Sequence, residues 1–528
     1  MTSAVATAGT SFSAAPAKVV NKWAVAVAVA TGALLEVIDT SIVNVALADI
    51  QSSVGATLSQ VSWVVSSYAV ANVIILPLSA WLGHRFGKKR YFVFSLIGFT
   101  LASMLCGMAT SLQMLVFARV LQGLMGGGLL AKAQTFLYET FPREEQALAQ
   151  GFFGAIVIAG PVLGPTLGGF ITTHSDWRWI FFVNVPVGIA AVFLCLQALP
   201  SDPVVRDKSS VDWIAIGLLA VGLGSMQTVL EEGNSEDWFH SLFIVALTAV
   251  SVFGLVAFVI RELRAEHPVV DLRILRYRSL WAGSLLSIIV GIALFGAMFS
   301  IPIFAQSVLR YTSEQTGLLL LPSALASAAT MILASRLMKR FDPRAVLVVG
   351  GLVLVMSLMM LGRLSTDTGE DQLFWPMIVR SVGTVLMFLP LTLAAIGPIP
   401  REDVAAATGF FNLTRQLGGS IGVALLSTIL DQRMSYHRSA LGAHLSVGDP
   451  ATLERLSVFT RLFMSQGASE GIAHDRALAL LDGLVQRQAS VLSFNDTFFV
   501  VAMLVLVFLP LVMLLGKPAK GAAVSGAH

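Results

Sequence analysis

Long apolar runs, separated by short polar or charged segments, recur along almost the whole chain. A helix that crosses a bilayer needs about 20 predominantly apolar residues, and the runs reach about that length. The pattern therefore predicts an all-α polytopic membrane protein with fourteen transmembrane helices. Their expected bounds are 23–47, 61–82, 91–109, 113–137, 150–173, 178–199, 212–231, 240–260, 280–306, 314–335, 345–363, 374–397, 404–430 and 496–516.

The composition agrees with this pattern. Of the 528 residues, 56% are hydrophobic and only 12% are charged, whereas soluble domains carry about 25% charged residues. The net charge of +3 is small and the basic residues are scattered among the loops, which argues against nucleic-acid binding. Cys106 and Cys195 both lie in apolar runs, where a cysteine acts as a small hydrophobic residue. Neither a metal site nor a cofactor is expected.

The positions of Lys and Arg predict the orientation, because the cytoplasmic loops of membrane proteins carry the excess of positive charge. With the N-terminus inside, most Lys and Arg residues fall in inner loops. The short outer loops and their edges hold only Arg178, Arg310 and Arg363. We therefore expect both termini in the cytoplasm, with a disordered segment at 1–21 and a short tail at 517–528.

An internal repeat divides the chain into two halves. Segment 84–89 recurs as 339–344, Arg119 has a counterpart at Arg380, and Gly164 and Gly168 match Gly418 and Gly422. Two six-helix halves related by an axis normal to the membrane are a transporter architecture. The expected organisation is an N-terminal half at 22–200, an inserted helix pair with a basic cytoplasmic linker at 201–279, and a C-terminal half at 280–516 with a long outer loop at 431–495.

Two carboxylates, Glu36 and Asp39, lie one helical turn apart deep in the first expected helix. An acid at that depth costs several kcal/mol unless it is protonated, paired or exposed to water. Arg119 lies at a similar depth in the fourth helix, where it would favour a charged Asp39 while burial favours a neutral one. Either a proton or cation site or a static buried pair explains this arrangement. The embedded Arg380 and Arg415 fit either an anionic substrate or contacts with backbone carbonyls.

A glycine- and proline-rich stretch characterises the fifth expected helix. Its residues are Gly160, Pro161, Gly164, Pro165, Gly168 and Gly169. Glycines four residues apart give a smooth face for close helix packing, and the prolines allow a bend. This composition suits a helix that rocks against a neighbour, and simple packing is the alternative.

Several stretches match a known family. They are Asp39-Thr40-Ser41-Ile42-Val43-Asn44, Arg119-Val120-Leu121-Gln122-Gly123, the Gly160–Gly169 stretch, 177–186 and 412–419. Over essentially its whole length the chain resembles the fourteen-span drug:proton antiporters of the major facilitator superfamily, most closely the EmrB-type permeases of Gram-negative bacteria. One motif differs, because Ala80 and His84 stand where the superfamily usually has Gly and Asp. This difference puts the charged cytoplasmic latch of the family in doubt, although Arg85, Gly87 and Lys88 of the same motif are present.

The resemblance implies a major facilitator fold and proton-driven export of hydrophobic or amphipathic toxic compounds across the bacterial inner membrane. It also implies a periplasmic adaptor and an outer-membrane channel as partners. Proton coupling is assigned to Asp39, with Arg119 as the partner that tunes it and Glu36 as an accessory carboxylate or a contact for cationic substrates. The candidate residues of the substrate cavity are Asn44, Gln122, Arg380 and Arg415.

The sequence leaves other functions open. A stand-alone exporter of a specific metabolite or weak acid, an importer, and a passive channel are alternatives. A membrane-embedded enzyme lacks support, because the chain has no histidine or cysteine cluster, nucleotide-binding loop or metal-ligand spacing. The loop at 431–495 contains amphipathic helical patterns, and it fits either an adaptor contact or a lid over the outer cavity.

Overall fold

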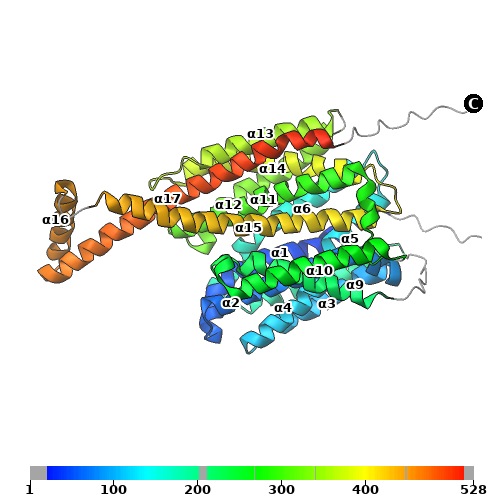
Figure 1. The fold of residues 1–528 in the computed structure, drawn as a ribbon, viewed down its shortest axis with the longest axis horizontal. Helices are drawn as coiled ribbons and strands as arrows, with labels where there is room; N and C mark the ends of the chain where they lie inside the picture. The colour runs from blue at the N-terminus through cyan, green and yellow to red at the C-terminus, as the bar shows by residue number, and fades with distance from the viewer. Residues whose placement is uncertain (1–20, 201–210, 267, 339, 446–448, 516–528) are drawn as a thin grey trace, which may run out of the picture.

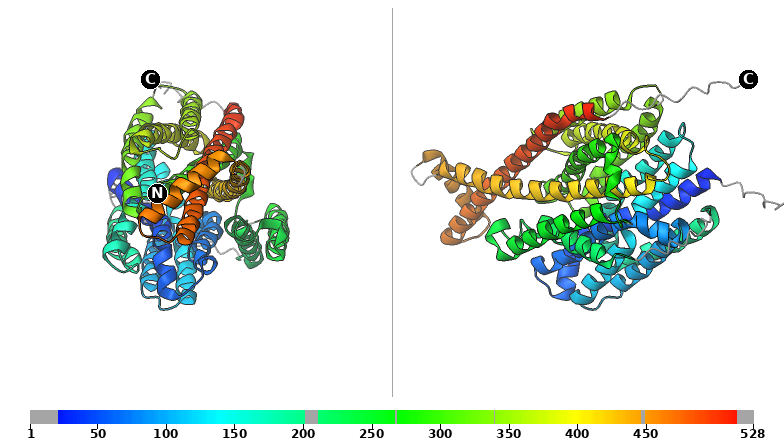
Figure 2. Two further views of the ribbon diagram at one scale, coloured as in Figure 1. Left: turned by 90° about the vertical axis from the view of Figure 1, so that its left-hand side faces the viewer. Right: turned by 45° about the vertical axis from the view of Figure 1, so that its right-hand side comes forward.

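The computed structural model describes residues 21–200, 211–266, 268–338, 340–445 and 449–515, so nearly all of the expected terminal segments 1–21 and 517–528 lies outside it. The helices form two bundles side by side, with a helix pair on one flank and a helical arm that projects from one end (Figure 1; Figure 2). Within the described ranges, 14 segments are long and apolar enough to cross a membrane, which confirms the expected number of spans.

The N-terminal bundle contains the first six spans. Its helices are α1 (Lys22–Val54), α2 (Leu58–Phe86), α3 (Lys88–Gly107), α4 (Leu112–Gly126), α5 (Leu129–Thr140), α6 (Gln146–His174), α7 (Trp179–Phe182) and α8 (Asn184–Ala198). Two spans consist of two helices each, α4 with α5 and α7 with α8.

The fourth span is interrupted at Gly127 and Gly128, where α2 approaches closely. A Cβ atom at Gly127 would lie 2.5 Å from the carbonyl oxygen of Asn72, so a larger residue would not fit there. The first N–H groups of any helix lack partners within that helix. The interruption therefore places backbone donors of α5 inside the bundle, close to α1.

The expected inserted pair is α9 (Trp213–Glu232) and α10 (Leu242–Arg264), joined through η1 (Trp238–His240). The two helices pack against each other, and α9 also contacts α2 and α15. The pair therefore lies on the flank of the molecule, beside both halves (Figure 2). A linker with η2 (Leu272–Arg276) leads to the C-terminal half, where Arg276 and Tyr277 bond Asp403 at the start of α15.

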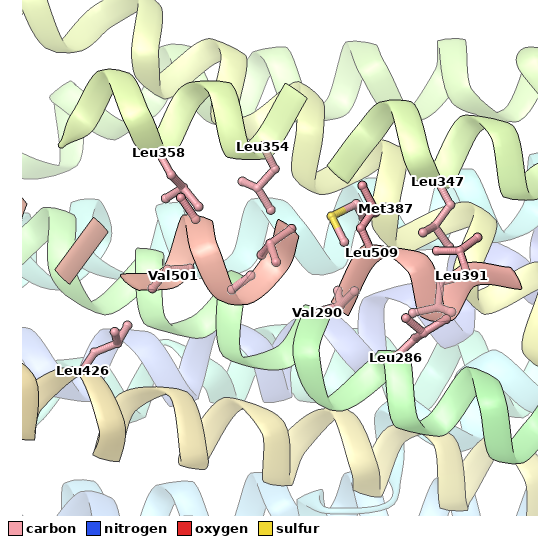
Figure 3. Packing of buried hydrophobic residues seen from close by; sticks show 14 of the residues in the cluster. Leu286, Val290, Leu347, Leu354, Leu358, Met387, Leu391, Leu426, Val501 and Leu509 are labelled. Carbon is pink, nitrogen blue, oxygen red and sulfur yellow. The ribbon is translucent and has the colours of Figure 1, made fainter. Parts of the chain in front are cut away.

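The C-terminal bundle contains the last six spans. Its helices are α11 (Arg278–Ser307), α12 (Ser313–Leu337), α13 (Pro343–Leu361), α14 (Glu370–Ile396), α15 (Val404–Ala443), α16 (Pro450–Ser465), α17 (Glu470–Phe508) and η3 (Leu509–Leu514). Apolar side chains from α11, α13, α14, α15 and α17 meet in its core (Figure 3). Among them are Leu286, Val290, Leu354, Leu358, Met387, Leu426 and Val501.

Residues 431–495, expected as a long loop, are mostly helical where they are described. α15 has 40 residues and α17 has 39, so both helices continue far beyond their apolar parts. Together with α16, which packs against α17, they form the projecting arm (Figure 1). Arg433 bonds Asp496 at 2.5 Å and Arg438 bonds Asp482 at 3.0 Å, which holds α15 and α17 together along the arm.

Both halves use glycines to bring two helices into close contact. A Cβ atom at Gly164 of α6 would overlap Ser41 of α1, and one at Gly168 would lie 3.0 Å from Ile42. In the C-terminal half, a Cβ atom at Gly422 of α15 would lie 2.7 Å from the Cα of Ile292 in α11. The contact of α11 with α15 therefore repeats that of α1 with α6.

Candidate functional site

Asp39 lies in the middle of α1 and is completely buried. Its Oδ2 accepts a bond of 2.5 Å from Nη1 of Arg119 in α4. Its Oδ1 accepts bonds from the amides of Gln122, at 2.8 Å, and Asn184, at 2.9 Å. The contact expected between Asp39 and Arg119 is therefore present, with two amide groups added to it.

Arg119 is 1% exposed and has partners on several sides. Its Nε donates to the carbonyl of Val64 in α2 at 2.9 Å, and its Nη1 donates to Oε1 of Gln122 at 2.8 Å. The guanidinium also lies 4.1 Å from the ring centre of Tyr68.

A buried ion pair stabilises a fold only when further hydrogen bonds offset the desolvation of both charges. The pair of Asp39 and Arg119 meets this condition, because both carboxylate oxygens and the arginine Nε have partners. Removal of either charge would leave the other buried without compensation, which costs about 3–5 kcal/mol. The pair therefore joins α1 to α2, α4 and α8.

Glu36 lies one turn before Asp39 and is also buried. Its Oε1 accepts a bond from the amide of Asn72 in α2, and its Oε2 accepts one from the backbone N–H of Leu130, each at 2.9 Å. Leu130 is in the first turn of α5, directly after the glycine break, where the helix dipole favours a negative charge. Arg415 of the C-terminal half also interacts electrostatically with Glu36.

Amide side chains join the two halves next to Arg415. Asn412 of α15 donates to Oε1 of Gln134 in α5 at 2.8 Å and accepts a bond from Nη2 of Arg415. The Arg415 guanidinium lies 4.9 Å from the ring centre of Phe388, and its buried Nη1 has no partner among the described residues. This set of residues forms a polar contact across the interface between the bundles.

A family model described as Major Facilitator Superfamily matches residues 29–423, well over half of the chain. The chain belongs to this superfamily. It is therefore a multi-pass membrane transporter rather than an enzyme.

Curated relatives of this major facilitator protein match along almost all of it. The chain is 32% identical to the multidrug export protein EmrB of Escherichia coli K12 over 95% of its length and 97% of that protein. It is 31% identical to the fatty acid resistance protein FarB of Neisseria gonorrhoeae, over 92% of the chain and 94% of FarB. The resemblance to EmrB-type permeases is thus confirmed.

The fold is also similar to that of a solved major facilitator structure. The proton:xylose symporter XylE matches with a TM-score of 0.57 and 14% identity, over 93% of this chain and 96% of XylE. The expected major facilitator fold is therefore confirmed.

The four residues expected in a substrate cavity lie apart. Gln122 belongs to the buried network around Asp39. Asn44 is exposed on α1, where its amide donates to the carbonyl of Thr40 at 3.4 Å. Arg380 of α14 and Arg415 of α15 are both buried in the C-terminal half.

The expected glycine motif lies where α6 meets α1. Gly160, Gly164 and Gly168 face Val37, Ser41 and Ile42, so the motif packs on the turns of α1 that surround Asp39. Gly169 is buried. Its carbonyl accepts a bond from the Thr173 hydroxyl. Pro165 is half-buried, and the side chain of Pro161 lies outside the described part of the chain.

The loop motif expected between the second and third spans lies between α2 and α3. Gly87 has φ of +89° and separates the two helices, a conformation that favours glycine. Lys88 forms an ion pair of 2.7 Å with Glu139 at the end of α5, and Arg85 lies over the ring of Trp81.

The sequence alone did not identify several polar residues of these networks. Asn184, Asn72, Gln134 and Asn412 all interrupt apolar runs, and this interruption is the signal that marks them. A further buried acid, Glu232 at the end of α9, accepts a bond of 2.7 Å from Ser66 of α2. The sequence did not indicate that Glu232 is buried, because an acid at the end of a span is usually exposed to water.

Proposed function

We propose that this transporter is a proton-driven exporter of hydrophobic or amphipathic toxic compounds across the bacterial inner membrane. The observation that carries the proposal is the buried pair of Asp39 and Arg119, inside a helix that rests on a glycine face. EmrB-type relatives are named as multidrug export proteins, and the similarity to them extends over almost the whole chain.

Protonation of Asp39 would provide the coupling step. When Asp39 takes up a proton from the periplasm it loses its charge, and Arg119 becomes a buried cation without a counter-charge. Such a cation is costly, so protonation favours a rearrangement of α1 relative to α4. Release of the proton to the cytoplasm restores the pair. Rocking of the two halves exposes the site alternately to each side of the membrane.

Glu36 is proposed as an accessory carboxylate. Its electrostatic interaction with Arg415 attracts the N-terminal half to the C-terminal half. Any change in the charge of Glu36, by protonation or by a nearby cationic substrate, would alter this attraction. The charge state of α1 can thereby influence the equilibrium between inward- and outward-open forms.

A tripartite assembly with a periplasmic adaptor and an outer-membrane channel is the second part of the proposal. It is supported by the projecting arm, which carries apolar side chains in contact with solvent on α16 and the first part of α17. These residues are Leu453, Val458, Leu462, Ile472, Leu478 and Leu484. A lid over the outer cavity is the alternative role of the arm.

The test compares Asp39→Asn with Asp49→Asn, an exposed position on the same helix. In vesicles with an imposed proton gradient, Asp39→Asn should lower uptake of a lipophilic dye to the level seen without a gradient, because the carrier can no longer lose a proton. The Asp49→Asn control should retain normal transport. Dye binding by the purified variants reports whether they are folded.

Two outcomes would contradict the proposal. Undiminished gradient-driven transport by Asp39→Asn at several pH values would remove Asp39 from the mechanism. Transport by the natural chain that survives an uncoupler would favour a passive channel instead.

A further inference from the structure

Arg380 lies in the middle of α14 and is 5% exposed. Its buried Nε has no acceptor. Within the described ranges, no carboxylate, carbonyl or aromatic ring is paired with its guanidinium. Asp39, Arg119 and Glu36 all have hydrogen-bond partners in the described part of the chain, and the Arg380 guanidinium has none there.

A buried unpaired charge costs several kcal/mol, so a purely structural role does not explain Arg380. A buried arginine with partners for its charge looks different in this chain. Arg119, its counterpart in the internal repeat, has a carboxylate, a backbone carbonyl and a ring around it.

The internal repeat shows what is missing near Arg380. In the N-terminal half the carboxylate comes from α1, which packs on the glycine face of α6. The corresponding helix is α11, because it packs on the glycine face of α15 and also contacts α14. Residues 278–307, which form α11, include no Asp or Glu. The second half therefore keeps the arginine and lacks its carboxylate.

We propose that the carboxylate of an amphipathic organic acid takes this position, so that Arg380 binds the anionic group of a substrate. This inference rests on the proposed exporter function and names one substrate class for it. An arginine is suited to the task because its planar donors match the two oxygens of a carboxylate.

Apolar side chains near Arg380 would suit the tail of such an acid. Thr384 and Phe388 follow Arg380 at intervals of four residues, so the three lie on one side of the helix. Phe388 belongs to an apolar cluster with Ile158 of α6 and Met331 of α12. An acid held at Arg380 could therefore extend its tail along α14 towards the interface between the halves.

Arg415 strengthens the attraction for an anion at this interface. Its guanidinium lies over Phe388, at the other end of the same stripe on α14, and its Nη1 is also without a partner. Because Arg415 already bonds Asn412 and interacts with Glu36, we assign the carboxylate to Arg380.

The experiment measures binding to the purified full chain in nanodiscs, without a proton gradient. The probes share one tail and differ in charge: dodecanoate, methyl dodecanoate and dodecyltrimethylammonium. Arg380→Gln should weaken dodecanoate binding about ten- to hundredfold, the loss expected for a hydrogen bond to a charged group. The other two probes should change by less than about twofold. Arg380→Lys should recover part of the lost affinity, and Arg264→Gln, at an exposed arginine, should bind dodecanoate normally.

Thermal stability separates a binding role from a structural one. Arg380→Gln removes a buried unpaired charge, so the ligand-free variant should melt at a higher temperature than the natural chain. Dodecanoate should raise the melting temperature of the natural chain and leave that of the variant unchanged.

Equal weakening of all three probes, or an unchanged preference for dodecanoate in Arg380→Gln, would overturn the inference. A failure of the proposed proton coupling would give a different result. Asp39→Asn would then keep its gradient-driven transport, while the natural chain would still prefer dodecanoate to the other two probes.

Discussion

Asp39 is surrounded by hydrogen-bond donors from α4 and α8. The charged carboxylate accepts from Arg119, Gln122 and Asn184. A protonated carboxyl needs an acceptor, and an amide offers one because it carries both a carbonyl oxygen and an NH₂ group. Gln122 Oε1 already lies in the network, where it accepts from Arg119. If Asp39 takes up a proton as proposed, we expect an amide to turn its oxygen to the carboxyl group.

Substitution of Asn184 should weaken this network. Asn184→Ala removes the donor that joins Asp39 to Ser103 of α3, so we expect a stability loss of about 1–3 kcal/mol. The measurement is the melting temperature of the purified protein, with Asn44→Ala as control because Asn44 is an exposed asparagine on α1. Equal destabilisation by the two substitutions would contradict the role given to Asn184.

The contact of Asp39 with Arg119 could be predicted from the sequence, because both residues are charged, embedded and at similar depth. The amide partners could not be predicted in the same way. An uncharged Asn or Gln is tolerated at many depths, and its choice of partner depends on how the helices rotate about their axes. Asn184 is a clear case, since it reaches Asp39 from 145 residues further along the chain.

At the level of helices, α1 and α6 pack closely against each other. Ser41 of α1 contacts the α6 backbone, where its hydroxyl lies 3.4 Å from the carbonyl of Gly160. No side chain of α6 stands between the helices at Gly160, Gly164 and Gly168, so their backbones approach directly. A contact of this kind allows one helix to slide along the other with little rearrangement of side chains.

A methyl group at this contact should slow transport. Gly164→Ala forces the new Cβ atom against Ser41, and overpacking of this kind costs about 1–3 kcal/mol. We expect lower gradient-driven transport with preserved folding. Gly217→Ala is the matched control, because a Cβ atom at Gly217 of α9 meets no atom within 4 Å and alanine favours the helix. Normal transport by Gly164→Ala would show that this close contact is not needed for transport.

The sequence predicted the number of membrane-spanning helices better than it predicted their lengths. Apolar runs mark where a helix crosses the bilayer, and those runs predicted fourteen spans. α15 continues to Ala443 although its apolar run ends near residue 430, because the amphipathic sequence that follows packs on α17 rather than in lipid. The apolar pattern did not predict the break after Gly126, because three consecutive glycines do not interrupt an apolar run.

At the scale of the whole molecule, polar contacts between the halves lie close to the candidate site. Gln134 bonds Asn412, and the Tyr138 hydroxyl donates to the carbonyl of Thr392 at 3.2 Å. Each contact joins residues more than 250 positions apart, so local sequence pattern carries no information about it. The internal repeat predicted two halves. It did not predict their mutual orientation, because that orientation depends on such long-range contacts.

The arm permits a test that separates a partner-binding role from a lid. Arg438 of α15 pairs with Asp482 of α17, so the two helices lie next to each other at this level. Replacement of residues 441–479 by a short Gly/Ser linker would remove α16 and the tip of the arm. The ion pairs that Asp496 forms with Arg433 and His437 would remain to hold the shortened helices together.

If the arm binds an adaptor, the shortened chain should transport normally in proteoliposomes, because the membrane-spanning halves are intact. In cells with two membranes it should no longer protect against a toxic substrate, since export would end in the periplasm. If the arm is a lid, transport in proteoliposomes should change as well. Full protection of cells by the shortened chain would exclude a required adaptor contact through α16. Comparison of the two assays therefore distinguishes an adaptor-binding role of the arm from a lid, whichever residue carries the proton.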